Sequence, residues 1–351
     1  MVQSSQPEGP INAGALRMPA EWEPQAAIWL SWPHNLETWP KNLAQAQFEF
    51  IRLAKVIAET QAVNVLCSSG LHAEVQTQCR TALGDVSNLT LVDIPTNDAW
   101  ARDYAPTFVK KTDGTLAAVD WHYNAWGGKY PPYDCDQNVC GRVAERLEIE
   151  VVDPQICLEG GAIEVNGRGV MLSTRSCALD PNRNPEHGLG DVDEILERHL
   201  GTDKHIWLSG NSLEGDDTDG HIDQLARFVD HQTIVYAWTA DKNDSQYFGL
   251  EKNLIELRRE LVANDLGNIS LIPLPIPAPI EYCGRRIPAS YCNFLITNEL
   301  VIVPQFKQLQ DQLAINCFKR VFPSREVVGL DSLNLSVGLG SFHCLSQQQP
   351  Q

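Results

Sequence analysis

Reactive side chains recur in four short motifs of this chain. Gly220-His221-Ile222-Asp223 offers an imidazole and a carboxylate, Trp100-Ala101-Arg102-Asp103 and Glu159-Gly160-Gly161 offer two further carboxylates, and His343-Cys344 offers a thiol near the C-terminus. A thiol, an imidazole and several carboxylates are suited to attack on a cationic carbon, because the carboxylates bind the cation while the imidazole moves protons.

The pair His221 and Asp223 has two interpretations. On an extended strand, side chains two residues apart lie on the same face, so this spacing predicts a base and a binding carboxylate that point into one space. A His-x-Asp sequence is also typical of a solvated surface strand, and the spacing by itself leaves both interpretations open.

Cys344 also has a structural interpretation, since free cysteines are often buried as small apolar residues. If Cys344 is a nucleophile, His221 is a better candidate for its base than His343, because adjacent residues on a strand point to opposite faces. The fold, not the local sequence, normally brings a nucleophile and its base together.

The two other carboxylates have structural alternatives as well. Asp103 could form an ion pair with Arg102 while Trp100 packs in the core. Glu159 could be a turn residue, although the two glycines after it also let the backbone approach a ligand closely.

The acidic run Glu214–Gly220 invites a calcium-loop interpretation. Aligning Gly220 with the glycine of an EF-hand loop puts Gly215 and Ala226 where carboxylates are required, so this interpretation fails. A transition-metal site built on the histidines and aspartates of these motifs lacks a supporting ligand spacing. We therefore predict no metal site.

Composition narrows the class of protein. The chain has 351 residues, 43% of them hydrophobic, which is enough to bury a large core. The formal net charge of -18 argues against a nucleic-acid partner and favours a cationic one. We find no signal-peptide pattern and no apolar run long enough to span a membrane. The ten cysteines form no Cys-x-x-Cys pair, so we expect reduced thiols, most of them buried, in a cytoplasmic protein.

Periodicity predicts an α/β fold built from a repeat. Four hairpin signals, each a pair of apolar-rich strands around a short polar turn, recur at intervals of roughly 50 to 70 residues. Helical periodicity and shorter apolar strands lie between them. The hairpins begin at 107–109, 162–165, 226–229 and 294–296, the helices cover 43–60, 138–147, 192–200, 245–264 and 307–321, and the shorter strands cover 62–66, 89–94, 205–208 and 269–274.

Each motif stands a few residues before a hairpin, so units related by rotation would bring the motifs to one central face. A ring of such units needs about five copies to close. The fifth is complete if Cys344 is followed in space by the N-terminal strand 26–31. We expect a flexible tail over residues 1–14 and a single catalytic domain over residues 15–351.

Taken in order, these motifs resemble the agmatine deiminase and bacterial peptidylarginine deiminase family of the guanidine-modifying, pentein superfamily. Single motifs are weak, but eight in order along nearly the whole chain are specific. They are Met18-Pro19-Ala20-Glu21-Trp22-Glu23-Pro24-Gln25, 97–103, Asn124-Ala125-Trp126-Gly127-Gly128, Glu159-Gly160-Gly161, Asn182-Arg183-Asn184-Pro185, 217–223, Ala289-Ser290-Tyr291-Cys292-Asn293-Phe294, and His343-Cys344 with the Gln-rich segment after it.

The resemblance implies a five-bladed α/β propeller around a central active site, and hydrolysis of a guanidinium to a ureido group with release of ammonia. It implies that Cys344 is the nucleophile, His221 the general acid and base, and Glu159 the partner that orients His221. Asp103 and Asp223 would be the carboxylates that bind the guanidinium. Trp100 could stack on the substrate, as could Trp126, although each could equally belong to the core.

The expected partner is a small cationic guanidine, agmatine first, with no cofactor, no nucleic acid and no membrane, in a chain that could form a homodimer. Two departures from the family pattern loosen the choice of agmatine: Gly338-Leu339-Gly340-Ser341-Phe342 stands where the family has a run of glycines, and Ala105 replaces a glycine. Alternatives are a deiminase of free arginine or of arginine in peptides, an amidinotransferase, and a guanidine-binding protein without turnover. A metal hydrolase would instead lose activity to chelators and tolerate loss of Cys344.

Overall fold

The computed structural model describes residues 16–83, 87–210 and 212–351, and the tail predicted for residues 1–14 lies outside them. Within the described residues, most strands belong to five mixed sheets of three or four strands each. In each sheet two antiparallel strands are followed, after a helix, by a third strand that pairs in parallel with the second. A parallel pair needs such a crossover connection, so the helix is part of the unit. The repeat of hairpin, helix and strand is therefore confirmed.

Four of these units occupy the middle of the chain, and their helices follow the predicted ranges to within a few residues. The units are β5 (Thr107–Lys111), β6 (Leu116–Val119), α6 (Val139–Leu147) and β7 (Glu150–Val152); β8 (Glu164–Val165), β9 (Val170–Thr174), α8 (Leu189–Leu200) and β10 (Lys204–Leu208); β11 (Ala226–Asp230), β12 (Thr233–Trp238), α9 (Tyr247–Ala263) and β13 (Ser270–Pro275); and β16 (Leu295–Ile296), β17 (Leu300–Gln305), α10 (Leu309–Val321) and β18 (Glu326–Asp331).

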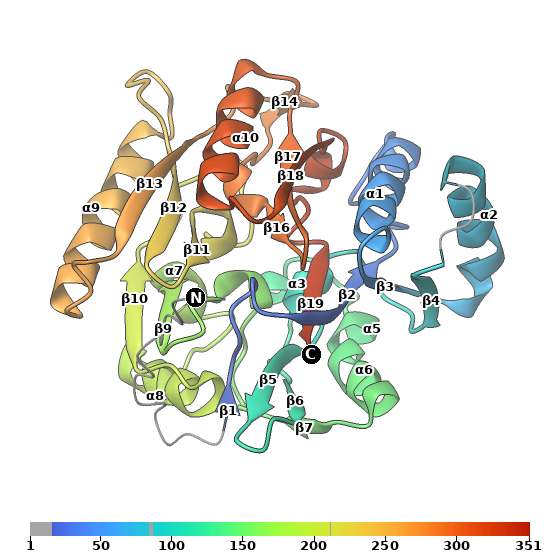
Figure 1. The fold of residues 1–351 in the computed structure, drawn as a ribbon, viewed down its shortest axis with the longest axis horizontal. Coiled ribbons are helices and arrows are strands. Elements are labelled where there is room, and N and C mark those ends of the chain that lie inside the picture. The colour runs from blue at the N-terminus through green and yellow to red at the C-terminus, as the bar shows by residue number, and fades with distance from the viewer. Residues whose placement is uncertain (1–15, 84–86, 211) are drawn as a thin grey trace, which may run out of the picture.

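The fifth unit joins the two ends of the chain. The C-terminal strand β19 (Ser346–Pro350) pairs antiparallel with β2 (Gln25–Ser31), with Ser346 opposite Leu30. The helix α1 (Leu43–Ala58) and the parallel strand β3 (Ala62–Cys67) then complete the unit. In Figure 1, β19 and α3 (Ala101–Tyr104) lie near the middle of the molecule while α1, α6, α8, α9 and α10 lie around the outside. The prediction that the last motif is followed in space by the N-terminal strand is confirmed.

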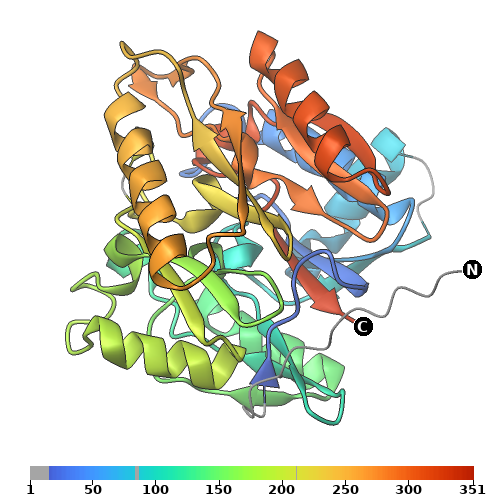
Figure 2. The same cartoon turned by 60° about the vertical axis from the view of Figure 1, so that its left-hand side comes forward.

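Several shorter elements extend these units. Strand β4 adds a fourth strand to the sheet of β2 and β3, β1 pairs with β5, and β14 and β15 form a separate hairpin. Figure 2 shows the same arrangement turned, with the N-terminal strand β1 beside the lower sheets. Their bounds, with those of the remaining helices, are β1 (Leu16–Arg17), β4 (Leu89–Asp93), β14 (Glu281–Tyr282), β15 (Arg285–Arg286), α2 (His72–Leu83), α3 (Ala101–Tyr104), α4 (Ala125–Gly128), α5 (Asp134–Gln137) and α7 (Arg175–Ala178).

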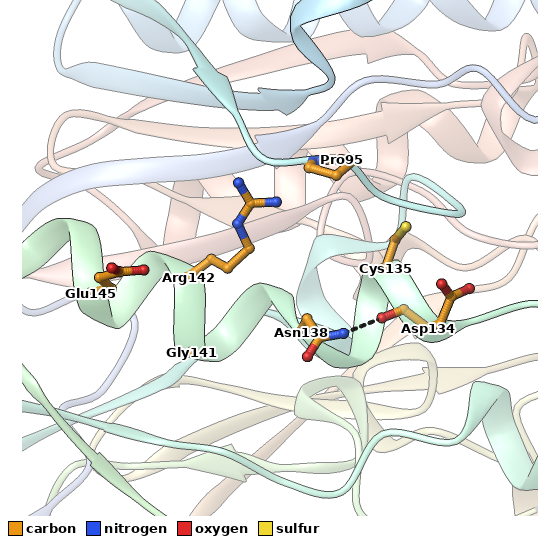
Figure 3. A pocket seen from close by; sticks show the side chains of 7 residues that line it. All are labelled: Pro95, Asp134, Cys135, Asn138, Gly141, Arg142 and Glu145. Atoms are coloured by element: carbon orange, nitrogen blue, oxygen red, sulfur yellow. Dashed lines mark hydrogen bonds between the residues drawn. The ribbon is translucent and has the colours of Figure 1, made fainter.

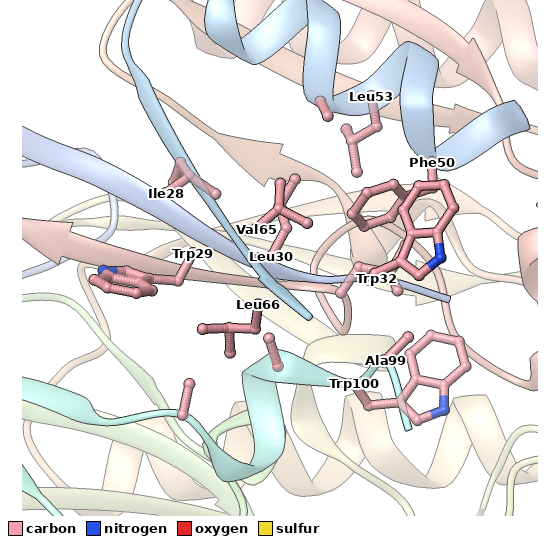
Figure 4. Packing of buried hydrophobic residues seen from close by; sticks show 14 of the residues in the cluster. Ile28, Trp29, Leu30, Trp32, Phe50, Leu53, Val65, Leu66, Ala99 and Trp100 are labelled. Atoms are coloured by element: carbon pink, nitrogen blue, oxygen red, sulfur yellow. The ribbon is translucent and has the colours of Figure 1, made fainter. Parts of the chain in front are cut away.

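The largest apolar cluster packs α1 against the sheet of β2 and β3. Phe50 and Leu53 on α1 meet Trp32 and Leu30, and all four side chains are almost fully buried. Figure 4 shows Trp100 at the edge of this cluster, so the core extends to a motif residue. Burying one large apolar side chain stabilises a fold by about 1.5–3 kcal/mol, and this cluster anchors the last unit of the chain to the first.

Helix α2 was missed by the sequence analysis. Among its described side chains only Val75 is buried, so the segment carries almost no apolar periodicity from which a helix could be recognised. Among the described residues, no helix is both long enough and apolar enough to cross a membrane.

Candidate active site

The motif residues lie on short turns that precede the first strand of a unit. Asp103 belongs to α3, and Glu159 immediately precedes the 3-10 helix η2 (Gly160–Ala162). Asp223 lies in the 3-10 helix η3 (Ile222–Gln224), and Cys344 lies in the turn before β19. Because α3 contacts η2 and η2 contacts η3, the turns of successive units meet.

The strand expected at His221 and Asp223 is wrong. His221 precedes η3 and Asp223 lies within it, so the alternation of a strand does not orient them. The solvated surface interpretation is wrong as well, because His221 is 1% exposed and Asp223 is fully buried. Gly220, at a φ of 95°, provides the left-handed backbone that leads the acidic turn into this buried segment.

Carboxylates surround the imidazole of His221 on two sides. Its Nδ1 lies 3.6 Å from Oδ1 of Asp103, and its Nε2 lies 3.5 Å from Oε2 of Glu159. Both distances exceed hydrogen-bond length, and neither ring nitrogen has a hydrogen-bond partner among the described residues. The imidazole is therefore held in a field of negative charge with both nitrogens available to a ligand.

The thiol of Cys344 lies beside Asp223 and Asn293. Its Sγ is 3.4 Å from Oδ2 of Asp223 and 3.0 Å from Nδ2 of Asn293. Although Cys344 is buried, as the structural interpretation assumed, polar groups surround its sulfur. The neighbouring His343 points elsewhere, since its Nδ1 lies 2.7 Å from Oδ2 of Asp223 and its Nε2 lies 3.1 Å from Glu21.

Asp223 has one occupied and one free oxygen. Oδ2 receives the contacts of His343, Asn293 and Cys344, whereas Oδ1 is buried and has no hydrogen-bond partner in the part of the chain that the structure describes. A buried, unpartnered carboxylate oxygen is unfavourable in the empty protein. It marks a position where a cationic ligand would be bound strongly.

Asp103 forms no hydrogen bond or ion pair with Arg102 in the described residues, so the ion pair considered from the sequence is wrong. The guanidinium of Arg102 turns away and binds Gln348 and the carbonyl of His343. Instead, Asp103 accepts a 3.0 Å hydrogen bond from the indole of Trp126 and another of 3.0 Å from the backbone amide of Gly161.

Arg183 fixes the position of Glu159. The Nε of Arg183 donates a 2.7 Å hydrogen bond to Oε1 of Glu159, and its Nη1 donates one of 2.7 Å to Asp219. The other oxygen of Glu159, Oε2, faces His221 and has no hydrogen-bond partner within the described ranges. Glu159 does stand at the start of a turn, but its carboxylate is buried and directed at the imidazole.

Burial and charge shift the pKa values of this cluster. Burial alone would lower the pKa of His221, but the negative charges of Asp103, Glu159 and Asp223 outweigh it and raise that pKa to about 9. Burial raises the pKa of Asp103 to about 6, although His221 opposes the rise. Burial, reinforced by Asp223 and Asp103, raises the pKa of the Cys344 thiol well above its usual value. At neutral pH the empty site therefore holds a thiol and a cationic imidazole.

Trp100 is buried beside the site. Its ring packs on Trp39 at a centroid distance of 5.4 Å, and a Cβ on Gly340 would lie only 2.4 Å from its edge. The departure from the family's glycine run, noted from the sequence, falls beside this ring, where Leu339 adopts a left-handed φ of 74°.

One buried group of side chains has the geometry of metal ligands: Glu21, Glu164 and His343. The guanidinium of Arg227 already pairs with both of its carboxylates and donates a further hydrogen bond to the carbonyl of Phe294. These ligand atoms are committed to a buried cation of the protein, so they do not fit a metal ion.

The acidic run is a capped turn. Asp216 accepts hydrogen bonds from the backbone and hydroxyl of Thr218, and Asp219 pairs with Arg183 and with Lys129. Tyr130 donates a hydrogen bond to Asp217, so the segment after Trp-Gly-Gly is tied to this turn.

A separate pocket of about 440 Å³ lies between α5, α6 and the loop after β4 (Figure 3). It contains none of the motif carboxylates, histidines or Cys344. Its lining is Pro95, Asp134, Cys135, Asn138, Gly141, Arg142 and Glu145.

Several supporting residues could be recognised from the sequence only as parts of motifs. Arg183, Asn293 and Glu21 stand inside the quoted segments, but nothing local reveals that they contact Glu159, Cys344 and His343. These partners are separated by 24, 51 and 322 residues along the chain, so only the fold identifies them.

Comparison with known proteins agrees with this geometry. The model of the Porphyromonas-type peptidyl-arginine deiminase family matches residues 17–350. An agmatine deiminase from Stutzerimonas stutzeri (strain A1501) is 37% identical over 361 residues, covering 95% of each chain. A cysteine-to-serine variant of C. jejuni agmatine deiminase, solved with substrate bound, is 30% identical with a TM-score of 0.88, covering 98% of this chain and 99% of that chain.

A more distant solved structure shares the fold alone. DDAH from Pseudomonas aeruginosa is 12% identical with a TM-score of 0.52, and the match covers 93% of this chain and 99% of that chain. The family match over nearly the whole chain and the relative of 37% identity lead to one conclusion. The chain belongs to the Porphyromonas-type peptidyl-arginine deiminase family.

Proposed function

We propose that this protein is an agmatine deiminase, which hydrolyses the guanidinium of agmatine to N-carbamoylputrescine and ammonia. The observation that carries the proposal is the buried cluster of a thiol, an imidazole and three carboxylates. Among the described residues, Asp223 Oδ1, Glu159 Oε2 and both nitrogens of His221 lack hydrogen-bond partners. A planar cation with several N–H donors satisfies such a set. No metal or organic cofactor is needed for this chemistry.

Asp103 and Asp223 would bind the guanidinium from two sides and hold its carbon over the sulfur of Cys344. Burial and then the negative charges of Asp223 and Asp103 raise the pKa of Cys344, and the bound cation offsets those charges. The thiol then loses its proton to solvent, and the thiolate attacks the guanidinium carbon. The tetrahedral adduct is neutral until His221 protonates its departing nitrogen, and the carboxylates stabilise the positive charge that then develops on nitrogen.

His221 is the proton carrier of both halves of the reaction. As a cation it donates a proton to the departing nitrogen, so that ammonia leaves and an amidino-cysteine intermediate remains. The neutral imidazole then takes a proton from water, whose oxygen attacks the same carbon and expels the thiolate. The ureido product leaves, and one water has been exchanged for one ammonia. Glu159 keeps the imidazole oriented and favours its cationic form before ammonia leaves and again after water has been deprotonated.

The surroundings favour agmatine over free arginine, which carries an additional carboxylate. Asp217 and Asp219 stand on the turn that leads into His221, and the nearby cations Lys129 and Arg183 are already paired with that turn. Among the described residues the carboxylate of Asp217 forms no ion pair, so it is the acidic group of this turn that is suited to an amine. Cys344 is only 6% exposed, which disfavours an arginine in a folded protein.

The test compares ammonia and ureido-product formation from agmatine, free arginine and a blocked arginine peptide, with wild type and Cys344→Ala, in the presence of chelator. We expect turnover of agmatine that is lost in Cys344→Ala and indifferent to chelator. Activity that survives in Cys344→Ala would exclude the thiol mechanism. Turnover of the peptide but not agmatine would reassign the substrate to peptidylarginine, and silence on all three substrates would favour a binding role.

Fold closure, the domain boundary and the role of Trp100 are further parts of the proposal. We propose that the five sheets close into a five-bladed pentein propeller, that residues 15–351 form one catalytic domain, and that Trp100 lines the substrate site. Ten free cysteines support a cytoplasmic location. An experimental structure with a bound guanidine would test the closure and the contact of Trp100.

We also propose a homodimer through α9. Phe248, Ile255 and Val262 are all exposed and recur every seven residues, so they form one apolar stripe on that helix. A second copy of the stripe, packed antiparallel, would cover it. Light scattering of wild type and Ile255→Glu should show a dimer and a monomer, and a monomeric wild type would exclude the proposal.

A further inference from the structure

The side-chain amide of Asn293 lies within hydrogen-bond distance of both the Cys344 sulfur and a carboxylate oxygen of Asp223. Its Nδ2 lies 3.0 Å from the sulfur of Cys344 and 3.1 Å from Oδ2 of Asp223. Asn293 is fully buried at the end of the 3-10 helix η4 (Tyr291–Asn293), which belongs to the unit that precedes the C-terminal strand.

The orientation of this amide follows from its other contacts. Its Oδ1 accepts hydrogen bonds from the backbone amides of His343 (3.1 Å) and Cys344 (3.3 Å), and a backbone N–H can only donate. The NH2 group must therefore face the sulfur and the carboxylate. With two hydrogens, it can donate to both acceptors at once.

The surroundings of the sulfur explain why such a donor matters. Asp223 lies 3.4 Å from Sγ, and both Asp223 and Asp103 disfavour a negative charge there. A lysine or arginine in this place would compete with a cationic substrate for the same carboxylates. A neutral amide donor stabilises the thiolate without adding positive charge.

We propose that Asn293 is a catalytic residue that donates a hydrogen bond to the thiolate of Cys344, an inference that rests on the proposed function. The sulfur carries negative charge before it attacks the guanidinium carbon and again when water expels it from the amidino intermediate. Between these steps it is bonded to carbon and is a weak acceptor. The hydrogen bond therefore strengthens as each charge develops on sulfur, which lowers the barrier for expelling it.

The same amide helps to decide which oxygen of Asp223 binds the protein and which oxygen is left for the substrate. Together with His343 it occupies Oδ2, which leaves Oδ1 directed to the substrate. Asn293 thus fixes the nucleophile relative to the carboxylate that would bind the guanidinium, and the two backbone contacts tie both to the turn before β19.

The decisive variant is Asn293→Asp, which preserves shape but replaces the donor by an acceptor. Its readout is the pH dependence of Cys344 alkylation by iodoacetamide, followed by mass spectrometry of the Cys344 peptide, without substrate. A hydrogen bond to a charged group predicts that alkylation at pH 8 falls about 10- to 100-fold, with a similar or larger fall in kcat. Agmatine binding, measured calorimetrically in a Cys344→Ala background, should be kept or tightened, because the added carboxylate attracts the cation.

Asn253→Asp is the matched control, because Asn253 is a buried asparagine on α9 that donates to Ser212. It should leave the alkylation profile of Cys344 unchanged. Asn293→Ala provides a second variant without added charge, and circular dichroism shows whether each variant folds. Alkylation profiles of both folded Asn293 variants that superimpose on wild type would overturn the proposal, as would failure of both variants to fold, which would make Asn293 structural.

The experiment separates this inference from the proposed function. If wild type turns over no guanidine but Asn293→Asp still slows alkylation, the proposed function fails and the thiolate contact stands. If agmatine is turned over but alkylation is unchanged in the folded variants, the proposed function stands and the role of Asn293 fails.

Discussion

The backbone amide of Gly161 donates a 3.0 Å hydrogen bond to Oδ1 of Asp103, and there is no room for a side chain between them. A Cβ at this position would lie 2.6 Å from Nδ1 of His221 and 2.7 Å from Oδ1 of Asp103. The glycine pair after Glu159 therefore lets a backbone donor reach the buried carboxylate while the imidazole stays in contact with it.

Gly161→Ala should reduce kcat/KM for agmatine by about 100-fold or more, because a misplaced catalytic group loses orientation steeply. Gly190→Ala is the control, since its Cβ meets nothing within 4 Å in helix α8. It should leave kcat/KM unchanged. Steady-state kinetics measure kcat/KM of both variants. A fully active Gly161→Ala would show that the site has more space than the structure indicates.

The pH profile of kcat/KM should be bell-shaped. Below about pH 6 the carboxyl of Asp103 becomes protonated and would no longer bind the guanidinium, and above about pH 9 His221 loses the proton that we propose it donates to ammonia. Because Asp103 and His221 interact electrostatically, the two apparent pKa values of the profile belong to the whole cluster and not to single residues.

Glu159→Gln removes a negative neighbour and should lower the pKa of His221, moving the alkaline limb to lower pH. The exposed residue Glu145 provides a control, since Glu145→Gln should not change the profile. An alkaline limb that stays near pH 9 in Glu159→Gln would mean that another group sets it.

Trp126→Phe should weaken substrate binding by about 10-fold with a smaller effect on kcat, because the indole N–H that orients Asp103 is lost while an aromatic ring remains. Loss of this donor also raises the pKa of Asp103, so the acidic limb should move to higher pH. In Trp121→Phe, which loses a similar hydrogen bond to Thr107, the acidic limb and KM should not change. Equal KM values in wild type and Trp126→Phe would contradict this role.

Arg227→Met should destabilise the protein by about 3–5 kcal/mol, because Glu21 and Glu164 would keep buried charges without their partner. The surface pair of Lys111 and Glu150 is the comparison, and Lys111→Met should change stability by less than about 1 kcal/mol. Urea unfolding followed by circular dichroism measures both. A loss for Arg227→Met no larger than that for Lys111→Met would show that the buried network tolerates the charge.

Local sequence patterns were enough to predict the repeated unit of this protein and most of its helices. Turn residues between apolar strands identified the repeat, and a 3.6-residue apolar period identified helices such as α1 and α9. Both signals depend only on residues that are close together in the sequence. Helix α2 escaped because its exposed, polar surface leaves no such period. The order of the motifs also indicated the family, which the comparisons confirm over residues 17–350.

The tertiary structure alone decided how the motif residues meet. The sequence placed His221 and Asp223 on a strand, but a 3-10 turn after Gly220 buries both, since turn backbones lack the period that local pattern detects. Likewise, no spacing along the chain reveals that Asn293 faces the sulfur of Cys344. These contacts join residues from different units, and the packing of the whole chain fixes them, whereas local sequence fixes only the identity of the reacting groups.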